Sequence, residues 1–312
     1  MRFAIVAAGG VGGFFGGKLA RAGEDVTFIA RGAHLAAIRE RGLEVKGPGD
    51  SFVVQPARAT DDLASVGVVD TVLVAVKSWQ LPELAPRLKP LVGPRTIVVP
   101  LLNGIDAPAQ LAEALGAEAV LGGLCAVLSR VARPGTIEVL GAAASMTFGE
   151  LSGAITPRIE SLREALGRAG INAVVPPDIT AAMWKKLVFI TAFGGVGAVT
   201  RAPAGTLRSI KETRELLEQA VTEVVAVGRA RGVALEAADV SKTLANVDGL
   251  PAEAFASMAR DLMEGKRSEL DAWNGAVVRL GREVGVPTPV HAFIYGSLLP
   301  AELKARGEVK SG

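Results

Sequence analysis

A glycine-rich turn near the N-terminus constrains the fold of this chain more than any other feature. The turn lies between a short apolar run at 2–7 and a segment of helical periodicity at 11–21, and a second apolar run follows at 25–30. This order predicts a β-strand, a helix and a second, parallel strand. Backbone N–H groups in such a turn can approach a pyrophosphate at the N-terminus of the helix, so the turn predicts a dinucleotide site. We expect the cofactor to contact Ala7, Ala8, Gly9, Gly10, Val11 and Gly12.

The turn departs from the usual Gly-x-Gly-x-x-Gly fingerprint at one position. Ala7 stands where the first glycine is usual, whereas Gly9 and Gly12 occupy the other two positions. The second strand ends without the Asp or Glu that a NAD-preferring site uses to bind the ribose 2′-hydroxyl. Arg31 stands there instead and would pair with a 2′-phosphate, so we expect NADP(H) as the cofactor. A solvated arginine at the end of a strand is the plainer alternative.

The first half of the chain continues to alternate between strands and helices. Strands are predicted at 71–76 and 96–100, with helical segments at 81–88 and 107–115. This alternation is typical of a parallel, doubly wound sheet. Further strands are expected at 120–128, 135–140, 145–148 and 171–175, and a helix at 158–168.

The sequence changes from strand-forming to amphipathic helical segments at Pro176-Pro177-Asp178, which predicts a domain boundary. The prolines end the preceding structure, and Asp178 can cap a helix. Beyond it, amphipathic segments dominate, at 179–192, 211–231, 252–264, 269–284 and 290–305. The predicted fold class is α/β, with a Rossmann-type doubly wound sheet at 1–177 and an all-helical C-terminal domain at 178–312.

Charge and composition exclude several classes of partner. The net charge of +2, with Lys and Arg scattered, argues against nucleic acid, and we expect no metal site. The longest apolar run, 187–199, is too short for a membrane span and predicts a buried helix in a cytoplasmic protein. The single cysteine, Cys125, is expected to be a buried, inert thiol. The apolar helical half could carry a homodimer interface.

Six short motifs occur in one order along the chain. They are Ala30-Arg31-Gly32-Ala33-His34-Leu35, Val76-Lys77-Ser78-Trp79-Gln80, Leu102-Asn103-Gly104, Trp184-Lys185-Lys186-Leu187, Ser257-Met258 followed by Asp261, and Ser268-Glu269-Leu270-Asp271-Ala272-Trp273-Asn274-Gly275. With these motifs the chain resembles the ketopantoate reductase (2-dehydropantoate 2-reductase) family over nearly its whole length. The resemblance implies a Rossmann domain joined to a helical domain, with the active site in the cleft between them.

The resemblance also implies roles for individual residues in the reduction of a 2-oxo acid, by default ketopantoate to pantoate in pantothenate biosynthesis. Lys186 would be the general acid that protonates the carbonyl oxygen, and Glu269 would complete the catalytic set and bind substrate with Ser257. Asn103 would lie near both substrate and cofactor, and Lys77 near the nicotinamide. An ammonium group suits this reaction because the carbonyl oxygen gains negative charge as hydride arrives.

Each of these residues also has a plainer interpretation. Lys186 and its neighbour Lys185 could be a solvated pair on an amphipathic helix. Ser268-x-x-Asp271 resembles a capping box, so Glu269 could simply add favourable charge to a first turn. Ser257 could be an ordinary helix residue, and Asn103 could serve the turn that it forms with the next glycine.

The chain departs from the family pattern near the expected substrate site. Asparagines are usual four and eight residues after the catalytic lysine, where this chain has Ile190 and Gly194, and Ala254 stands at a third usual asparagine. An apolar pocket with Gly194 making room would suit a more hydrophobic 2-oxo acid, with Arg201 or Arg260 as partner of its carboxylate.

Two further alternatives lie outside this reaction. One is a non-catalytic NADP-binding redox sensor, and the other is a related dehydrogenase of 3-hydroxy acids or sugar acids. The motifs place neither His34 nor His291 in the reaction, and His34 is expected at the surface.

Overall fold

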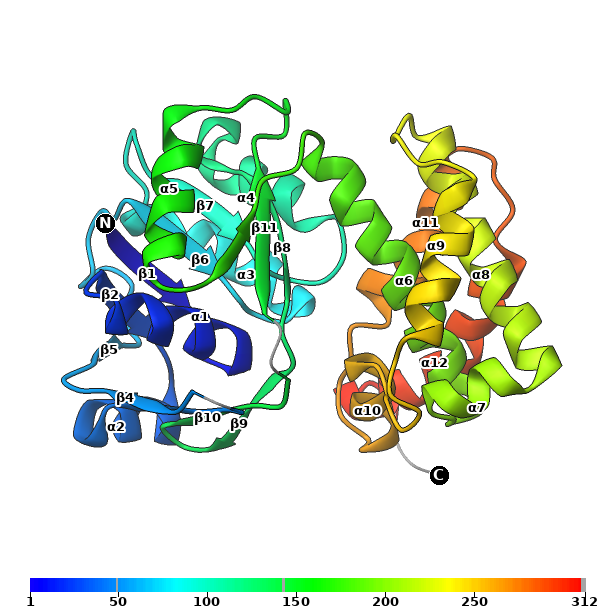
Figure 1. Cartoon of the computed structure of the whole chain (residues 1–312), viewed down its shortest axis with the longest axis horizontal. Helices are drawn as coiled ribbons and strands as arrows, with labels where there is room; N and C mark the ends of the chain where they lie inside the picture. Colours follow the sequence, from blue (N-terminus) through cyan, green and yellow to red (C-terminus); the bar gives the residue numbers. More distant parts are fainter. Residues whose placement is uncertain (49, 142–143, 310–312) are drawn as a thin grey trace. The chain divides into compact units, whose positions relative to one another are not determined.

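The computed structural model describes residues 1–48, 50–141 and 144–309, and these form two compact units (Figure 1). The first unit contains residues 1–102 and 106–179, and the second contains 103–105 and the chain from Thr180 onward. The domain boundary expected between residues 177 and 178 stays a prediction.

A five-stranded parallel sheet in the order β5-β2-β1-β6-β7 forms the centre of the first unit. Its strands are β1 (Arg2–Val6), β2 (Asp25–Ile29), β5 (Arg58–Thr60), β6 (Thr71–Val74) and β7 (Ile97–Pro100). Alternate side chains of β1 enter different cores: Phe3 and Ile5 pack in one cluster, while Ala4 and Val6 pack in another. Both faces of the strand are therefore buried, which explains its continuous apolar sequence.

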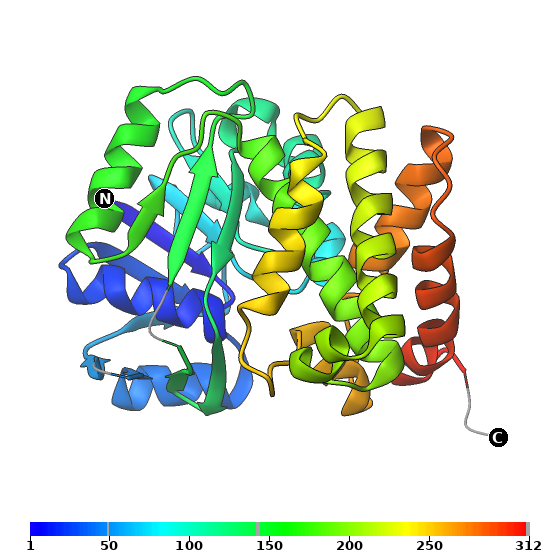
Figure 2. The same ribbon diagram turned by 45° about the vertical axis from the view of Figure 1, so that its right-hand side comes forward.

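Helices cover this sheet, and the predicted parallel, doubly wound architecture is confirmed (Figures 1 and 2). The helical elements of the unit are α1 (Gly10–Arg21), α2 (Gly32–Arg41), η1 (Ser78–Gln80), α3 (Leu81–Leu84), η2 (Ala85–Leu91), α4 (Ala107–Leu115), η3 (Ala117–Ala119) and α5 (Pro157–Arg168). The amphipathic segment expected at 107–115 matches α4 at both ends.

Two smaller sheets complete the first unit. One has the order β4-β3-β10-β9 and the other β12-β11-β8. Their strands are β3 (Leu43–Lys46), β4 (Phe52–Val54), β8 (Gly122–Ala126), β9 (Ser129–Arg133), β10 (Thr136–Val139), β11 (Ser145–Gly149) and β12 (Asn172–Val174). The parallel pairing of β10 with β3 joins segments far apart in the chain, since Ile137 lies opposite Val45.

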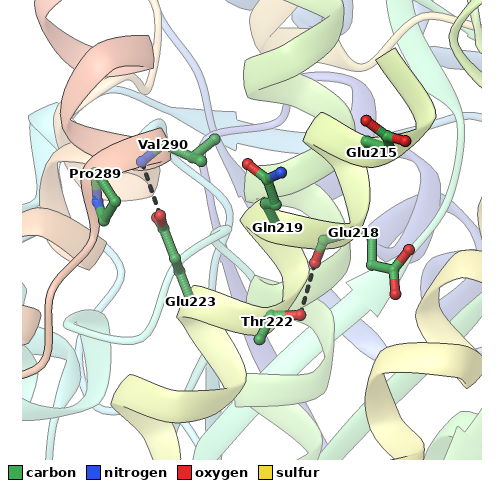
Figure 3. A pocket seen from close by; sticks show the side chains of 7 residues that line it. All are labelled: Glu215, Glu218, Gln219, Thr222, Glu223, Pro289 and Val290. Atoms are coloured by element: carbon green, nitrogen blue, oxygen red, sulfur yellow. Dashed lines mark hydrogen bonds between the residues drawn. The ribbon is translucent and has the colours of Figure 1, made fainter. Parts of the chain in front are cut away.

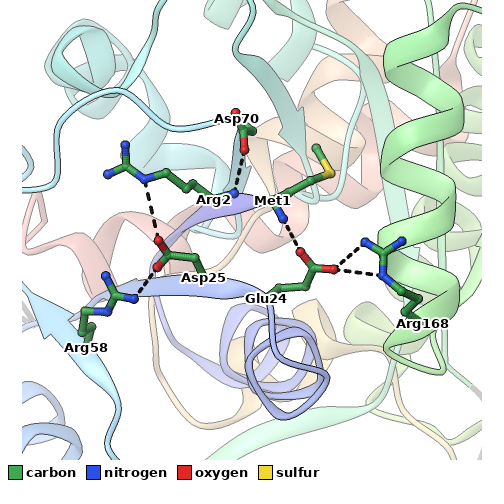
Figure 4. Close-up of polar contacts among 7 residues, drawn as sticks. All are labelled: Met1, Arg2, Glu24, Asp25, Arg58, Asp70 and Arg168. Atoms are coloured by element: carbon green, nitrogen blue, oxygen red, sulfur yellow. Dashed lines mark hydrogen bonds and ion pairs between the residues drawn. The ribbon is translucent and has the colours of Figure 1, made fainter.

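Ion pairs connect the beginning of β2 to the N-terminus, to α5 and to β5 (Figure 4). The Glu24 carboxylate binds the amino group of Met1 and, at 2.6 Å, the guanidinium of Arg168 on α5. Asp25 pairs at 2.6 Å with Arg58 on the neighbouring strand β5. These contacts fix the start of the strand whose other end carries Arg31.

Within the residues that the structure describes, the secondary-structure elements of the second unit are all helical, as predicted. Its elements are α6 (Ile179–Thr200), α7 (Ala204–Ser209), α8 (Lys211–Ala230), α9 (Ala238–Asp248), α10 (Ser257–Met263), the π-helical turn η4 (Asp271–Gly275), α11 (Ala276–Glu283) and α12 (Pro289–Arg306). By length and composition α6 could cross a membrane, but 72% of its most apolar window is buried, so it is a core helix, as expected for the apolar run within it.

Two helices differ from their predicted bounds. The segment expected at 179–192 continues to Thr200, because Gly194 and the glycine after it pack closely under other side chains and tertiary contacts offset their low helix propensity. The segment expected at 252–264 becomes helical only at Ser257. Its first carbonyls are used elsewhere: Ala252 O and Ala254 O accept hydrogen bonds of 2.8 and 3.0 Å from the beginning of α7.

Candidate active site

The predicted cofactor residues of the first unit gather at one edge of the central sheet. Strands β1, β2 and β6 are neighbours and end at Val6, Ile29 and Val74, which lie side by side in register. The glycine-rich turn, Arg31 and Lys77 follow these three strand ends in the sequence. The carboxyl edge of an open parallel sheet is where such folds bind their ligands.

The turn residues have different structural roles. Ala7 adopts a φ of 72°, the left-handed conformation for which the fingerprint usually supplies a glycine. A Cβ at Gly12 would lie 2.1 Å from the carbonyl oxygen of Ala7, so helix α1 meets the turn at a distance that only glycine permits. A Cβ at Gly9, the N-cap of α1, would meet nothing within 4 Å. The turn is thus closed toward the protein and open at Gly9.

His34 connects this turn to the second sheet, a role that the sequence did not indicate. The half-buried ring bonds through Nε2 to the carbonyl oxygen of Ala8 at 2.8 Å, and its Nδ1 accepts the backbone N–H of Gly135 at 3.0 Å. These bonds define the neutral tautomer with the proton on Nε2, because Nδ1 is an acceptor. His34, which the sequence placed at the surface, is thus half-buried and bonded to two backbone groups.

Arg31 and Lys77 differ in their surroundings. Arg31 is the N-cap of α2, its side chain is exposed, and it forms no ion pair within residues 1–48, 50–141 and 144–309. Lys77 is half-buried and precedes η1, where its backbone N–H donates to Oε1 of Gln80 at 3.1 Å. The exposed guanidinium of Arg31 is thus available to an anion at the sheet edge.

The two adjacent lysines on α6 occupy different environments in the second unit. Lys185 is exposed and pairs at 3.3 Å with the buried carboxylate of Asp239 on α9. Lys186 is half-buried. The interpretation of both as a solvated pair therefore does not hold for Lys186.

Three segments that carry predicted site residues meet around Gly194. A Cβ at this position would lie 2.8 Å from Cζ3 of Trp273 and 3.3 Å from Cβ of Ala256. Ala256 immediately precedes Ser257, and Trp273 follows Glu269 by one turn, with its N–H donating to Glu269 O at 3.0 Å. The glycine therefore makes room for the indole of Trp273, and the room for substrate expected at this position stays a prediction.

Asn103 and Glu269 belong to the same unit. The residue after Asn103, Gly104, has a φ of 99° and lies against Ala272, whose carbonyl oxygen would be 3.3 Å from a Cβ at Gly104. Glu269 is 5% exposed, and the Ser268 hydroxyl before it accepts the N–H of Leu270 at 3.2 Å. The capping box expected at Ser268-x-x-Asp271 is not formed, because the turn that follows has Leu270 as its N-cap and no side-chain cap, and Glu269 itself is buried rather than part of a solvated first turn.

A cavity of about 490 Å³ lies elsewhere in the second unit, between α8 and the beginning of α12 (Figure 3). It is lined by Glu215, Glu218, Gln219, Thr222, Glu223, Pro289 and Val290. It contains none of the predicted site residues. The described residues include no group of three or more His, Cys, Asp or Glu side chains that could hold a metal ion.

Known proteins resemble the chain over almost its entire length. Residues 3–153 match the family model described as ketopantoate reductase PanE/ApbA, and residues 178–302 match the C-terminal model of the same family. The 2-dehydropantoate 2-reductase of Mesorhizobium japonicum is 32% identical, with 93% of this chain and 94% of that protein covered. The uncharacterized oxidoreductase YkpB of Bacillus subtilis is 29% identical, with 96% and 98% covered. The crystal structure of a PanE/ApbA family ketopantoate reductase from Ralstonia eutropha superposes with a TM-score of 0.90 at 30% identity, covering 98% of this chain and all of that one.

Proposed function

The chain belongs to the ketopantoate reductase PanE/ApbA family of oxidoreductases, and on this premise we propose that it reduces 2-dehydropantoate to pantoate with NADPH. The observation that carries the proposal is the family match in both units, together with Lys186, Ser257 and Glu269 in the second. Lys186 lies on the same helix as Gly194, and Gly194 packs against Ala256, which precedes Ser257, and against Trp273, which is bonded to Glu269.

The turn of the first unit fits a dinucleotide. Gly9 leaves open space at the N-terminus of α1, where backbone N–H groups and the helix dipole favour a pyrophosphate. Ala7, Ala8, Gly10, Val11 and Gly12 would shape this cradle. Arg31, exposed at the end of β2, would bind a 2′-phosphate and so favour NADPH over NADH. Lys77 and Asn103 would lie toward the nicotinamide.

When bound, NADPH supplies the hydride that converts the carbonyl carbon of the 2-oxo acid into the carbon of an alcohol. The negative charge that develops on the carbonyl oxygen is stabilised by the ammonium group of Lys186, which then donates its proton to that oxygen. Glu269, Ser257 and Asn103 would bind and orient the substrate. Lys186 recovers its proton from solvent after the product leaves.

The test is oxidation of NADPH in the presence of ketopantoate, run beside Lys186→Ala and with NADH as a control. We expect turnover by the unaltered protein, loss of at least about 100-fold in kcat for Lys186→Ala, and a clear preference for NADPH. Arg31→Ala should reduce that preference by weakening NADPH binding alone. An unchanged preference would remove the 2′-phosphate assignment.

A panel of 2-oxo acids separates ketopantoate from more hydrophobic substrates. Ile190 favours a more hydrophobic substrate. It lies one turn after Lys186, at a position where the family usually has an asparagine, so an apolar side chain stands in place of an amide. Higher kcat/KM for a larger apolar 2-oxo acid would transfer the proposal to that substrate. Tight NADPH binding without turnover of any 2-oxo acid would instead support the redox sensor.

A further inference from the structure

The last helix of the chain places a glutamate on its buried face. The buried residues of α12 are His291, Ile294, Leu298 and Glu302, spaced three or four apart as on one stripe of a helix. The side chain of Glu302 is 0% exposed. A buried carboxylate is costly unless it is paired and hydrogen-bonded, so the partners of Glu302 indicate what it does.

The partners of Glu302 lie directly before Glu269. Oε2 of Glu302 accepts the backbone N–H of Ser268 at 2.9 Å and the hydroxyl of the same residue at 2.5 Å. Oε1 accepts Nε of Arg306 at 2.8 Å, one turn further along α12. The Ser268 hydroxyl in turn accepts the N–H of Leu270. One carboxylate therefore fixes the backbone on the N-terminal side of Glu269.

The same helix fixes the chain on the other side of Glu269. Nη2 of Arg306 donates to Oδ2 of Asp271 at 2.5 Å, and the hydroxyl of Tyr295 donates to Oδ1 of that carboxylate at 2.9 Å. Both donors belong to α12. Glu269 is thus held between two residues, Ser268 and Asp271, that are both bonded to α12.

Stability alone does not account for this arrangement. Well-packed apolar side chains can replace a whole buried ionic cluster with little or no loss of stability, so a matched set of apolar residues in place of the cluster could attach α12 equally well. The polar cluster instead specifies one position of the segment 268–271. That segment leads into the π-helical turn η4, where Gly275 N–H bonds to Leu270 O at 3.0 Å, and π-helical turns are rare and frequently lie at functional sites.

We infer that Glu302 and Arg306 are positioning residues that hold Glu269 in place for the substrate. The inference rests on the proposed function, because that function gives Glu269 its substrate. Neither residue needs to touch the substrate, since both act through Ser268 and Asp271.

Glu223 on α8 provides a matched control, because it bonds to the opposite end of α12. Its carboxylate accepts three hydrogen bonds, from Val290 N–H at 2.7 Å (Figure 3), His291 N–H at 3.0 Å and His291 Nδ1 at 2.8 Å. The carboxylate of Glu302 also accepts three. Both glutamates therefore attach α12 to the rest of the unit, but only Glu302 contacts the segment that carries Glu269.

Hydrogen–deuterium exchange of the full-length protein tests the positioning without any substrate. Glu302→Gln leaves one N–H or O–H donor without an acceptor, so we expect the amides of Ser268 and Leu270 to exchange at least about tenfold faster. Glu223→Gln should leave these amides unchanged and accelerate those of Val290 and His291. Equal exchange at 268–270 in the unaltered protein and in Glu302→Gln would overturn the inference.

Steady-state kinetics then tests the effect on the substrate. For Glu302→Gln and Arg306→Lys we expect KM for the 2-oxo acid to rise about tenfold or more while the Kd of NADPH stays within about twofold, since one lost charge-assisted hydrogen bond corresponds to at least a factor of ten. Glu223→Gln should lower Tm without this change in KM. Equal KM values in all variants would overturn the inference.

If the unaltered protein reduces no 2-oxo acid, the proposed function fails. The difference in hydrogen–deuterium exchange between Glu302→Gln and Glu223→Gln then decides by itself whether Glu302 positions residues 268–271. Arg306→Lys keeps the charge and gives a second variant should Glu302→Gln not fold.

Discussion

Two glycines of the N-terminal turn should respond in opposite ways to the same substitution. In Gly12→Ala the new Cβ would lie 2.1 Å from Ala7 O, whereas ordinary van der Waals contact begins at 3.4 Å, so the two must separate by at least 3.4 − 2.1 = 1.3 Å. Because the obstructing atom belongs to the backbone, we expect a cost of about 3 kcal/mol, at the upper end of the usual range for overpacking. For a domain of this size that corresponds to a fall in Tm of roughly 6–12 °C.

Gly9→Ala should instead leave the fold intact and weaken cofactor binding. The residue has a φ of −72° and open space around its Cβ position, so alanine fits without strain and could add about 0.4–1 kcal/mol by restricting the unfolded chain. The methyl group would occupy space that the proposed pyrophosphate needs, and we expect the Kd of NADPH to rise at least about tenfold, or about 1.4 kcal/mol.

Thermal unfolding and a fluorescence titration with NADPH, performed on both variants, separate the two effects. A Gly12→Ala variant with the Tm of the unaltered protein would refute the argument that the turn and α1 approach too closely for a Cβ. A Gly9→Ala variant with normal NADPH affinity would show that the cofactor does not approach the chain at this residue.

Three further substitutions test the N-terminal turn, an ion pair between Glu150 and Arg158 in the first unit, and a contact of α12 in the second. Ala7→Gly should raise the free energy of unfolding by about 0.5–1 kcal/mol in urea titrations, because glycine adopts the φ of 72° without the strain that alanine carries; a loss of stability would contradict this. Hydrogen bonds from Arg158 lower the pKa of Glu150, so this pair stabilises the fold at neutral pH and the benefit disappears as the pH falls through the lowered pKa. Glu150→Gln should therefore be less stable than the unaltered protein at pH 7, and the gap should close in acid; a gap that does not vary with pH would contradict the assignment. Burial, and then the hydrogen bond to Asp271, raise the pKa of Tyr295, the single tyrosine of the chain, so Asp271→Asn should lower that pKa in an ultraviolet titration, and an unshifted curve would count against the bond.

The sequence predicted elements whose stabilising contacts are local or periodic. The central strands β1, β2, β6 and β7, helix α4 and the helical second unit were indicated by apolar runs and periodicity, whereas the short edge strand β5 was not predicted. The sheet β4-β3-β10-β9 was predicted only in part, because its central pairing joins Val45 to Ile137 and no local pattern records which partner a short strand will find. The roles of the individual site residues stay predictions.

The residues that support the candidate site were harder to find than its motifs. Glu302 had a detectable signal, since it continues the stripe of Ile294 and Leu298 at a spacing of four, and a charged residue on an apolar stripe calls for a buried partner. Its partner Ser268 lies on another element, however, and periodicity within α12 does not reveal it. His34 had no such signal, because its two bonding partners, Ala8 and Gly135, are backbone groups that only the folded chain brings together.

The bridging ring of His34 has a consequence for redesign of the cofactor preference. Exchanging the whole strand–helix junction for one from a NAD-dependent relative would remove the ring together with Arg31, and the carbonyl of Ala8 and the amide of Gly135 would both lose their partner. A graft of that kind would alter the proposed pyrophosphate cradle as well as the contact with the 2′-phosphate that we propose for Arg31. Substitutions confined to Arg31 leave the hydrogen bonds of His34 to Ala8 and Gly135 in place. A change of cofactor specificity should therefore begin with Arg31 alone.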